Sequence, residues 1–141
     1  MTPAQVSLVK DSFSHVLPIR TAAAAIFYER LFTIDPKLRT LFSATDMEEQ
    51  GNKLMTALAF VVNGLDRAET ILPAVRQLAQ RHVHYGVKDE HYATVGQALI
   101  ETLAAGLGAA FTADVRAAWQ AAYVLLASVM IDAAHGEAIA A

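Results

Sequence analysis

The residue best suited to chemistry in this sequence is a histidine on the apolar face of a predicted helix. Ile71, Val75 and Leu78 follow the spacing of one helix face, and continuing that spacing by four residues gives His82. Gly86 then suits the end of this helix, because glycine adopts left-handed conformations easily. His82 is either a core histidine with satisfied ring nitrogens or an inward-facing metal ligand. Zinc needs three or four protein ligands, whereas haem iron needs only one histidine when the porphyrin supplies four ligands.

Two further polar side chains interrupt apolar helix faces. Tyr28 lies on the apolar face of the helix predicted for residues 20–34, and Gln50 lies four residues before Leu54 on the apolar face of the next long helix. Taken alone, each is more typical of core packing than of cofactor contact, because a buried hydroxyl or amide usually finds an internal partner. Together with His82, they direct polar groups from separate helices at an apolar interior. This is the layout of a cofactor pocket.

The other titratable residues indicate a solvated surface. Four histidines fall on polar faces or in the tail, and we expect solvated side chains there: His15, His84, His91 and His135. Asp89 is expected to cap the helix that it precedes, where negative charge suits the helix dipole. The sequence contains no G-x-S-x-G motif, phosphate-binding loop or dinucleotide-binding fingerprint, so it shows none of these catalytic patterns.

The elements that must position these residues are all helical. Caps, prolines and apolar spacing predict six main helices and one short turn, and no segment alternates as a half-buried strand does. Thr2 and Thr45 are expected to open capping boxes, and residues 63–69 are expected to form a polar link. The predicted elements, in chain order, are approximately residues 3–17, 20–34, 35–41 (the short turn), 45–62, 71–86, 89–107 and 112–135. The predicted fold class is all-α, with about six main helices around one core in a single domain, residues 1–141.

Composition excludes several functions. The 141 residues carry a net charge of −3 with scattered Lys and Arg, which argues against nucleic-acid binding. The absence of cysteine excludes disulfides, thiol catalysis, iron–sulfur clusters and covalent C-x-x-C-H haem attachment. No run of eighteen apolar residues predicts a membrane span, and the N-terminus lacks the features of a signal peptide. We therefore expect a cytoplasmic protein.

In this order and spacing, the motifs resemble a bacterial single-domain globin and the globin domain of flavohaemoglobins. The segments that carry the resemblance are residues 27–32, 35–36, 41–42, 50–54, 79–82, 92–96, 118–119 and 122–123. The resemblance implies a globin fold around a haem b pocket in which His82 is the proximal iron ligand. It also implies that Phe42 packs on the porphyrin, that Tyr28 and Gln50 face bound ligand, and that Leu54 lies beside it.

The resemblance implies roles for further apolar residues. Leu78, Val87 and Tyr92 would lie on the His82 side of the haem. Phe27, Leu58 and Val95 would complete, with Phe42 and Leu54, an apolar wall that limits water access: together these are the expected cofactor contacts.

The implied function is reversible binding of oxygen, with nitric oxide and carbon monoxide as further diatomic ligands. The alternative is nitric oxide dioxygenation, for which we expect a separate reductase to supply electrons, because the 141 residues contain no reductase domain. A haem-based sensor and an interaction module without haem rank lower, and the protein is expected to be a monomer or a homodimer. Flavohaemoglobins carry a glutamate on the last helix near the proximal tyrosine and histidine. This chain has Ala134 there, with Glu137 about one turn later.

Overall fold

The computed structural model describes the backbone of residues 1–140 and the side chains of residues 1–135. This part of the chain contains six α-helices and four short 3₁₀ segments and no strand, which confirms the all-α prediction. The α-helices are α1 (Pro3–Val16), α2 (Arg20–Ile34), α3 (Met47–Asn63), α4 (Ala68–His84), α5 (Asp89–Leu107) and α6 (Ala113–Ala140). The 3₁₀ segments are η1 (Leu17–Ile19), η2 (Pro36–Phe42), η3 (Leu65–Arg67) and η4 (Gly108–Ala110).

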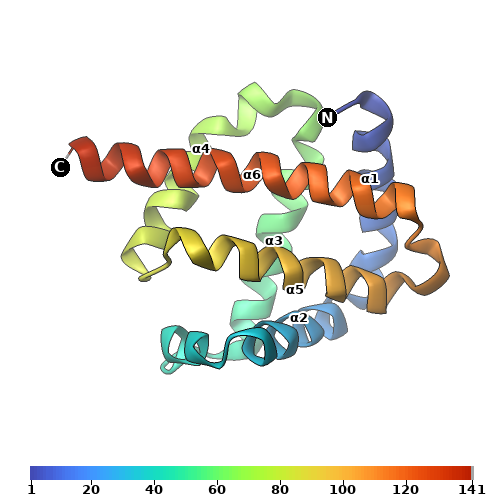
Figure 1. The fold of residues 1–141 in the computed structure, drawn as a ribbon. Coiled ribbons are helices and arrows are strands. Elements are labelled where there is room, and N and C mark those ends of the chain that lie inside the picture. The colour runs from blue at the N-terminus through green and yellow to red at the C-terminus, as the bar shows by residue number, and fades with distance from the viewer. Residues whose placement is uncertain (141) are drawn as a thin grey trace.

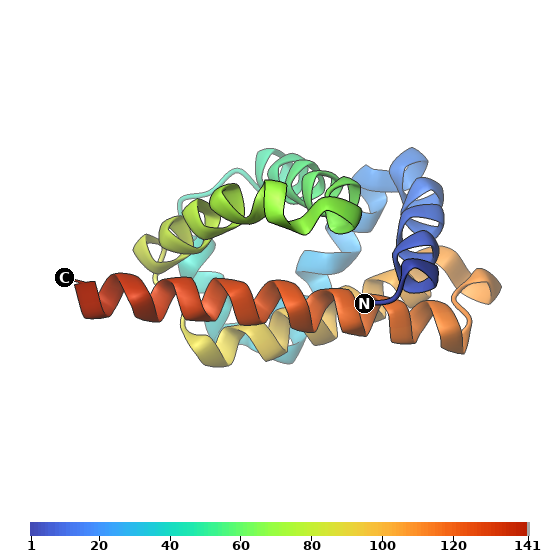
Figure 2. The same cartoon turned by 90° about the horizontal axis from the view of Figure 1, so that it is seen from above.

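The helices form two layers. Helices α5 and α6 lie side by side, α2 packs on α5, and α1 crosses the first half of α6 (Figure 1). Seen from above, α3 and α4 lie on one side of the molecule and α5 and α6 on the other (Figure 2). Helix α4 packs extensively on α6, so the helix that carries His82 is supported from the opposite layer.

Some helices begin at the capping residue that the sequence predicts, and others have a different capping residue. The Thr2 capping box is present, because Thr2 Oγ1 accepts from Gln5 N and Gln5 Oε1 accepts from Thr2 N. The expected box at Thr45 is wrong: Asp46 is the cap, and its carboxylate accepts from the backbone amides of α3's first turn. At this position a carboxylate accepts hydrogen bonds from two backbone amides, and its negative charge interacts favourably with the helix dipole. A threonine hydroxyl carries no charge and cannot match this interaction.

Two other predicted boundaries also shift. Asp89 is the first residue of α5 rather than its cap, because Lys88 has the extended backbone of the capping position. The link predicted over residues 63–69 is largely helical, since η3 occupies part of it and α4 begins at Ala68. The first difference is one residue and the second is three, since the predicted helix start at residue 71 moves to Ala68. Both lie at a helix end, where backbone geometry rather than residue type decides the boundary.

The buried apolar side chains form two separate clusters. The larger cluster joins α1, α2, α3, α5 and α6, and includes Trp119, whose Nε1 donates to Ser12 Oγ at 2.8 Å. The smaller cluster joins α4 to α6: Ile71, Val75, Ala79 and Met130. A domain of this size usually has one contiguous core. Several large apolar side chains at the edges of the two clusters are only half-buried.

Helix α6 contributes to both clusters. By length and composition alone, its residues Ala113–His135 could cross a membrane. Val115, Trp119 and Met130, which point inward from this helix, are buried in the protein instead. Other apolar residues of α6, Val124 and Leu125 among them, are exposed, so the two clusters cover only part of this helix.

Candidate functional site

His82 has one ring nitrogen bound and one without a protein partner. Its Nδ1 lies 2.8 Å from the carbonyl oxygen of Leu78, one turn earlier on α4. No side chain or backbone group among residues 1–135 hydrogen-bonds Nε2. Burial lowers the pKa of the imidazole, and the charge of Arg81 lowers it further against the opposing effect of the Leu78 bond. A neutral ring that donates through Nδ1 keeps the Nε2 lone pair available, as metal-bound histidines do.

The backbone after His82 holds the imidazole at the end of its helix. The amide of Tyr85 donates to the carbonyls of Arg81 and His82, and the amide of Val87 donates to the His82 carbonyl. Gly86 has a φ of 87°, which confirms the left-handed turn predicted there. The chain therefore turns away directly after His82.

Opposite this helix, Tyr28 lies in a cluster of aromatic rings. Its side chain is 8% exposed, and its ring packs edge-on against Phe27 and Phe42 at centroid distances of 5.0 Å and 5.5 Å. Phe32 packs edge-on against Phe42 at 5.5 Å. These contacts fix the direction of the Tyr28 hydroxyl, because the ring has neighbours on several sides.

Gln50 lies beside the Tyr28 hydroxyl. Burial raises the pKa of Tyr28, and a hydrogen-bonding interaction with the Gln50 side chain opposes that rise in part. Tyr28 consequently stays protonated near neutral pH and can donate a hydrogen bond. The structure thus brings together two of the three polar groups that the sequence directed inward, from α2 and from the first turns of α3.

A glycine that the sequence reasoning missed allows this pairing. Gly51 is buried, and a Cβ built there would lie 3.0 Å from the Cβ of Ala24. The backbones of α2 and α3 therefore approach closely, one turn before Tyr28 and next to Gln50. The available signal was a glycine inside a predicted helix, which often marks a close approach of two backbones.

Half-buried apolar side chains from several elements lie at the edges of the two clusters. Four of the predicted wall residues lie at the edge of the larger cluster: Phe42, Leu54, Leu58 and Val95. Leu78 and Tyr92 lie at the edge of the smaller cluster, and Val87 is also half-buried. Phe27 differs, because it is only 4% exposed and lies within the closed core behind Tyr28.

These residues fit a haem. A flat apolar cofactor between the two clusters would cover side chains that are now half-buried, and the His82 Nε2 would meet its iron. No group of three His, Asp or Glu residues within the described part of the chain could hold a free metal ion. A single histidine with no hydrogen-bond partner at Nε2 suits an ion that brings its own ring of ligands.

Behind the His82 side, α5 and α6 are joined by polar contacts. The Tyr123 hydroxyl donates to the carbonyl of Tyr92, and burial raises the pKa of both phenols. Gly96 makes room for this ring, since a Cβ there would lie 2.7 Å from Tyr123 Cε2. His135 was expected to be only solvated, but its Nε2 bonds to the Asp89 carboxylate.

The glutamate typical of flavohaemoglobins has no counterpart at its aligned position. Ala134 is half-buried and carries no polar group. The Glu137 side chain lies outside the described residues, so its suggested replacement role stays a prediction.

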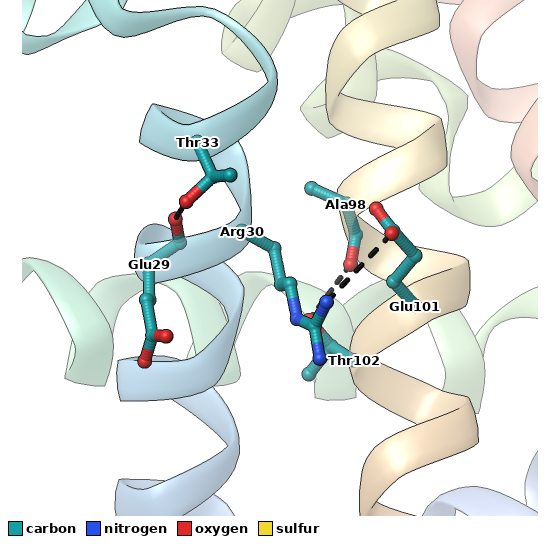
Figure 3. A network of polar contacts seen from close by, with 6 residues as sticks. All are labelled: Glu29, Arg30, Thr33, Ala98, Glu101 and Thr102. Atoms are coloured by element: carbon teal, nitrogen blue, oxygen red, sulfur yellow. Dashed lines mark hydrogen bonds and ion pairs between the residues drawn. The ribbon is translucent and has the colours of Figure 1, made fainter.

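An ion pair also joins α2 to α5 (Figure 3): Arg30 Nη1 lies 3.9 Å from Glu101 Oε1. Within α5, the Thr102 hydroxyl donates to the Ala98 carbonyl at 2.7 Å. The second oxygen of Glu101 is buried without a partner among the described residues. Because the pair is partly exposed, its main effect is to set how α2 sits on α5 rather than to add much stability.

Comparisons with known proteins agree with this geometry. Residues 25–130 match the family model described as Globin. Flavohemoproteins of Vibrio cholerae and Bordetella parapertussis are 32% and 34% identical to this chain over 94% and 93% of its length. The chain covers only 34% and 33% of those two proteins.

Two solved structures share the whole architecture. An engineered carbene transferase, made from a protein described as a nitric oxide dioxygenase of Rhodothermus marinus, superposes with a TM-score of 0.88 at 26% identity. That superposition covers 99% of this chain and 97% of the other. A bacterial globin of Campylobacter jejuni gives a TM-score of 0.85 at 26% identity, covering 96% of this chain and 97% of the other.

Proposed function

This chain belongs to the globin family, and we propose that it is a haem b protein that binds oxygen reversibly. Family membership implies haem binding. The observation that carries the proposal is the state of His82: it is half-buried near the end of α4, its Nδ1 is bound to the Leu78 carbonyl, and its Nε2 has no hydrogen-bond partner in the described structure.

Two sets of side chains would hold the haem. His82 would ligate the iron, with Leu78, Val87 and Tyr92 packed on the same side. The opposite side would be formed by Phe42, Leu54, Leu58 and Val95. When bound, haem iron supplies reversible coordination of diatomic molecules, and the polarity of the surrounding pocket decides which of them is held.

Tyr28 and Gln50 would select and retain the ligand. The phenol stays protonated because burial raises its pKa, so its hydroxyl donates into the pocket. The Gln50 amide supplies a second donor. A diatomic molecule with partial negative charge on its outer atom is stabilised by such preplaced donors, as developing charge is in an oxyanion hole. The aromatic rings around Tyr28 exclude water, which strengthens the hydrogen bond.

An optical experiment tests the proposal. The purified chain, loaded with haem b and reduced, is expected to show a Soret band that changes on oxygen addition and returns when oxygen is removed. A chain without a Soret band would contradict haem binding. A chain that oxidises irreversibly at the first exposure to oxygen would contradict reversible binding.

Nitric oxide dioxygenation is the second candidate. It is favoured by the flavohemoprotein relatives and by the Rhodothermus marinus neighbour. In this role the chain would act in the cytoplasm with a separate reductase as its electron source. Rapid multiple turnover of nitric oxide with a supplied reductant would distinguish this enzyme from a carrier, which would react only once per haem.

A further inference from the structure

A surface pocket that the proposed function does not use lies at the connection between α2 and α3. It has a volume of about 410 Å³ and is formed by the end of α2, by η2 and by the start of α3. Six residues line it: Phe32, Arg39, Thr40, Phe42, Ser43 and Met47. Of the residues expected to contact haem, only Phe42 belongs to this lining. The pocket is therefore a second site that shares one residue with the proposed haem site.

The buried part of the lining is aromatic. Phe32 is buried, and its ring packs edge-on against the half-buried Phe42 with the two centroids 5.5 Å apart. Met47 is exposed, so its flexible thioether can adapt to a bound ring. An aromatic ligand can pack edge-on or offset against the two phenyl rings, which are the arrangements that aromatic pairs prefer. The volume lies within the range of sites for small molecules, so the lining suits a ligand of one or two rings.

The exposed part of the lining carries a positive charge and hydrogen-bond donors. The guanidinium carbon of Arg39 lies 4.8 Å from the centroid of the Phe32 ring, so a cation–π contact holds this side chain over the ring. Neither the Arg39 guanidinium nor the Ser43 hydroxyl forms a hydrogen bond or ion pair with a group of residues 1–135. The Thr40 hydroxyl donates to the Lys37 carbonyl at 2.9 Å. Arg39 and Ser43 therefore supply the free donors of the pocket.

The pocket has no negative charge of its own to balance Arg39. Among the described residues, no aspartate or glutamate lines it. The carboxylates on either side of η2, those of Asp35 and Asp46, accept hydrogen bonds from backbone amides at the starts of η2 and α3. A guanidinium binds a carboxylate with two parallel hydrogen bonds. A neutral aromatic molecule would leave the charge unused, and an inorganic anion would leave the phenyl rings unused, so the matching ligand is an aromatic ring that bears a carboxylate.

We propose that this pocket binds a small aromatic carboxylate and that the bound molecule slows oxygen release. Arg39 and Ser43 hold the carboxylate, while the ligand ring packs against Phe32 and Phe42. The effect on oxygen release rests on the proposed function.

Phe42 connects the two sites. Its ring packs edge-on against Phe32 on the pocket side and against Tyr28, in each case with centroids 5.5 Å apart. A ligand ring that packs on Phe42 favours the arrangement in which Phe42 holds the Tyr28 phenol in place. The Tyr28 hydroxyl then stays where it donates to bound oxygen. Because such coupling is reciprocal, oxygen binding must tighten the binding of the carboxylate by the same factor.

The test titrates 2-naphthoate into the haem-loaded full chain in its ferrous, carbon monoxide-saturated form, in which the iron has no free position for a carboxylate. Calorimetry is expected to give a dissociation constant on the order of 0.1–1 mM. The neutral 2-naphthamide, which has the same shape, should bind at least about tenfold more weakly, because it lacks the charge that Arg39 pairs with. Amide chemical shifts should change at residues 39–43 and at Met47. In stopped-flow experiments, saturating 2-naphthoate should slow oxygen release by about fivefold.

Substitutions in η2 make the result specific. Arg39→Gln should raise the dissociation constant of 2-naphthoate by about tenfold or more, and Arg39→Lys should have a smaller effect, because lysine keeps the charge without the planar fork. Lys37→Gln removes the same charge from an exposed residue outside the lining and should bind 2-naphthoate as the wild type does.

Equal affinity for 2-naphthoate and 2-naphthamide, or wild-type affinity in Arg39→Gln, would overturn the carboxylate site. Binding of 2-naphthoate with an unchanged rate of oxygen release would overturn the coupling through Phe42. A chain without a Soret band would refute the proposed function instead, and calorimetry on that chain would still decide whether the pocket binds 2-naphthoate.

Discussion

The Tyr28 side of the site is enclosed in the larger cluster, whereas the His82 side rests on a small cluster close to solvent. Tyr28 is surrounded by aromatic rings and is 8% exposed. His82 is supported by a cluster of four buried residues, and its neighbour Tyr85 is 62% exposed. In the proposed haem protein the difference would separate two tasks: Tyr28, which would donate to the bound ligand, is protected from water, whereas His82, which would bind the iron, lies closer to the surface.

The largest expected effect is on the exposed side. His82→Ala should abolish normal haem binding, because none of the other described histidines lies on the inward face of α4. The Soret absorbance relative to protein measures the loss, and His84→Ala, two residues away on an exposed position, is the matched control. Retention of the wild-type spectrum by His82→Ala without added imidazole would refute the ligand assignment.

On the enclosed side, Tyr28→Phe should speed oxygen release. A hydrogen bond to a charged group contributes about 1.5–3 kcal/mol, and each 1.4 kcal/mol is about tenfold, so the rate should rise roughly ten- to a hundredfold. The release rate of carbon monoxide should change much less, because carbon monoxide carries less charge on its outer atom. Stopped-flow release measures both rates.

Gln50→Leu should accelerate oxygen release less than Tyr28→Phe does. In the double variant the effects of the two substitutions on the oxygen release rate should be non-additive, because the two side chains interact. Oxygen release from Tyr28→Phe at the wild-type rate would mean that Tyr28 only packs the core.

Close helix packing behind His82 yields a stability prediction. A Cβ at position 96 would lie 2.7 Å from Tyr123, so Gly96→Ala should lower the free energy of unfolding by about 1–3 kcal/mol. On the same helix, Gly106→Ala meets only an ordinary contact at 3.4 Å and should be neutral or stabilising by up to about 1 kcal/mol. Denaturant-induced unfolding measures the free energy of unfolding of each variant. Equal stability of both variants would show that Tyr123 moves aside freely.

Alkaline pH should destabilise the folded chain through buried phenols on both sides of the site. The pKa values of Tyr28 and Tyr123 are raised above the ordinary 10.0, so the unfolded chain loses these protons first as the pH rises. The stabilisation from each phenol is therefore complete below about pH 10. Above that pH it falls by about 1.4 kcal/mol per pH unit, until the pH passes the pKa of the folded state. Unfolding free energies measured across this range should fall less steeply for Tyr123→Phe. An identical slope in that variant would contradict the assignment.

The smallest expected effect is electronic. With Ala134 in place of an acid, His82 should have little imidazolate character, and the ferrous iron–histidine stretch should lie near that of ordinary oxygen carriers by resonance Raman spectroscopy. Ala134→Glu should raise the stretch. A wild-type stretch as high as in peroxidases would indicate that Glu137 or another acid acts on the imidazole.

The sequence by itself determined the helices and the inward direction of the three polar side chains. Apolar spacing, the Thr2 cap and the Gly86 turn are local features, so residue type and interval suffice to predict them. His82 stood out because an imidazole interrupts an aliphatic series.

Only the tertiary structure decided which distant groups meet. Gly51 and Gly96 matter because another helix passes close to each, and neither neighbour is near in sequence. The Asp89–His135 bond and the Tyr123–Tyr92 bond likewise join α5 to α6 across many residues. Local sequence fixes the face of a helix but not the helix that packs on it. The half-buried apolar side chains at the edges of the two clusters therefore come together only when the layers assemble.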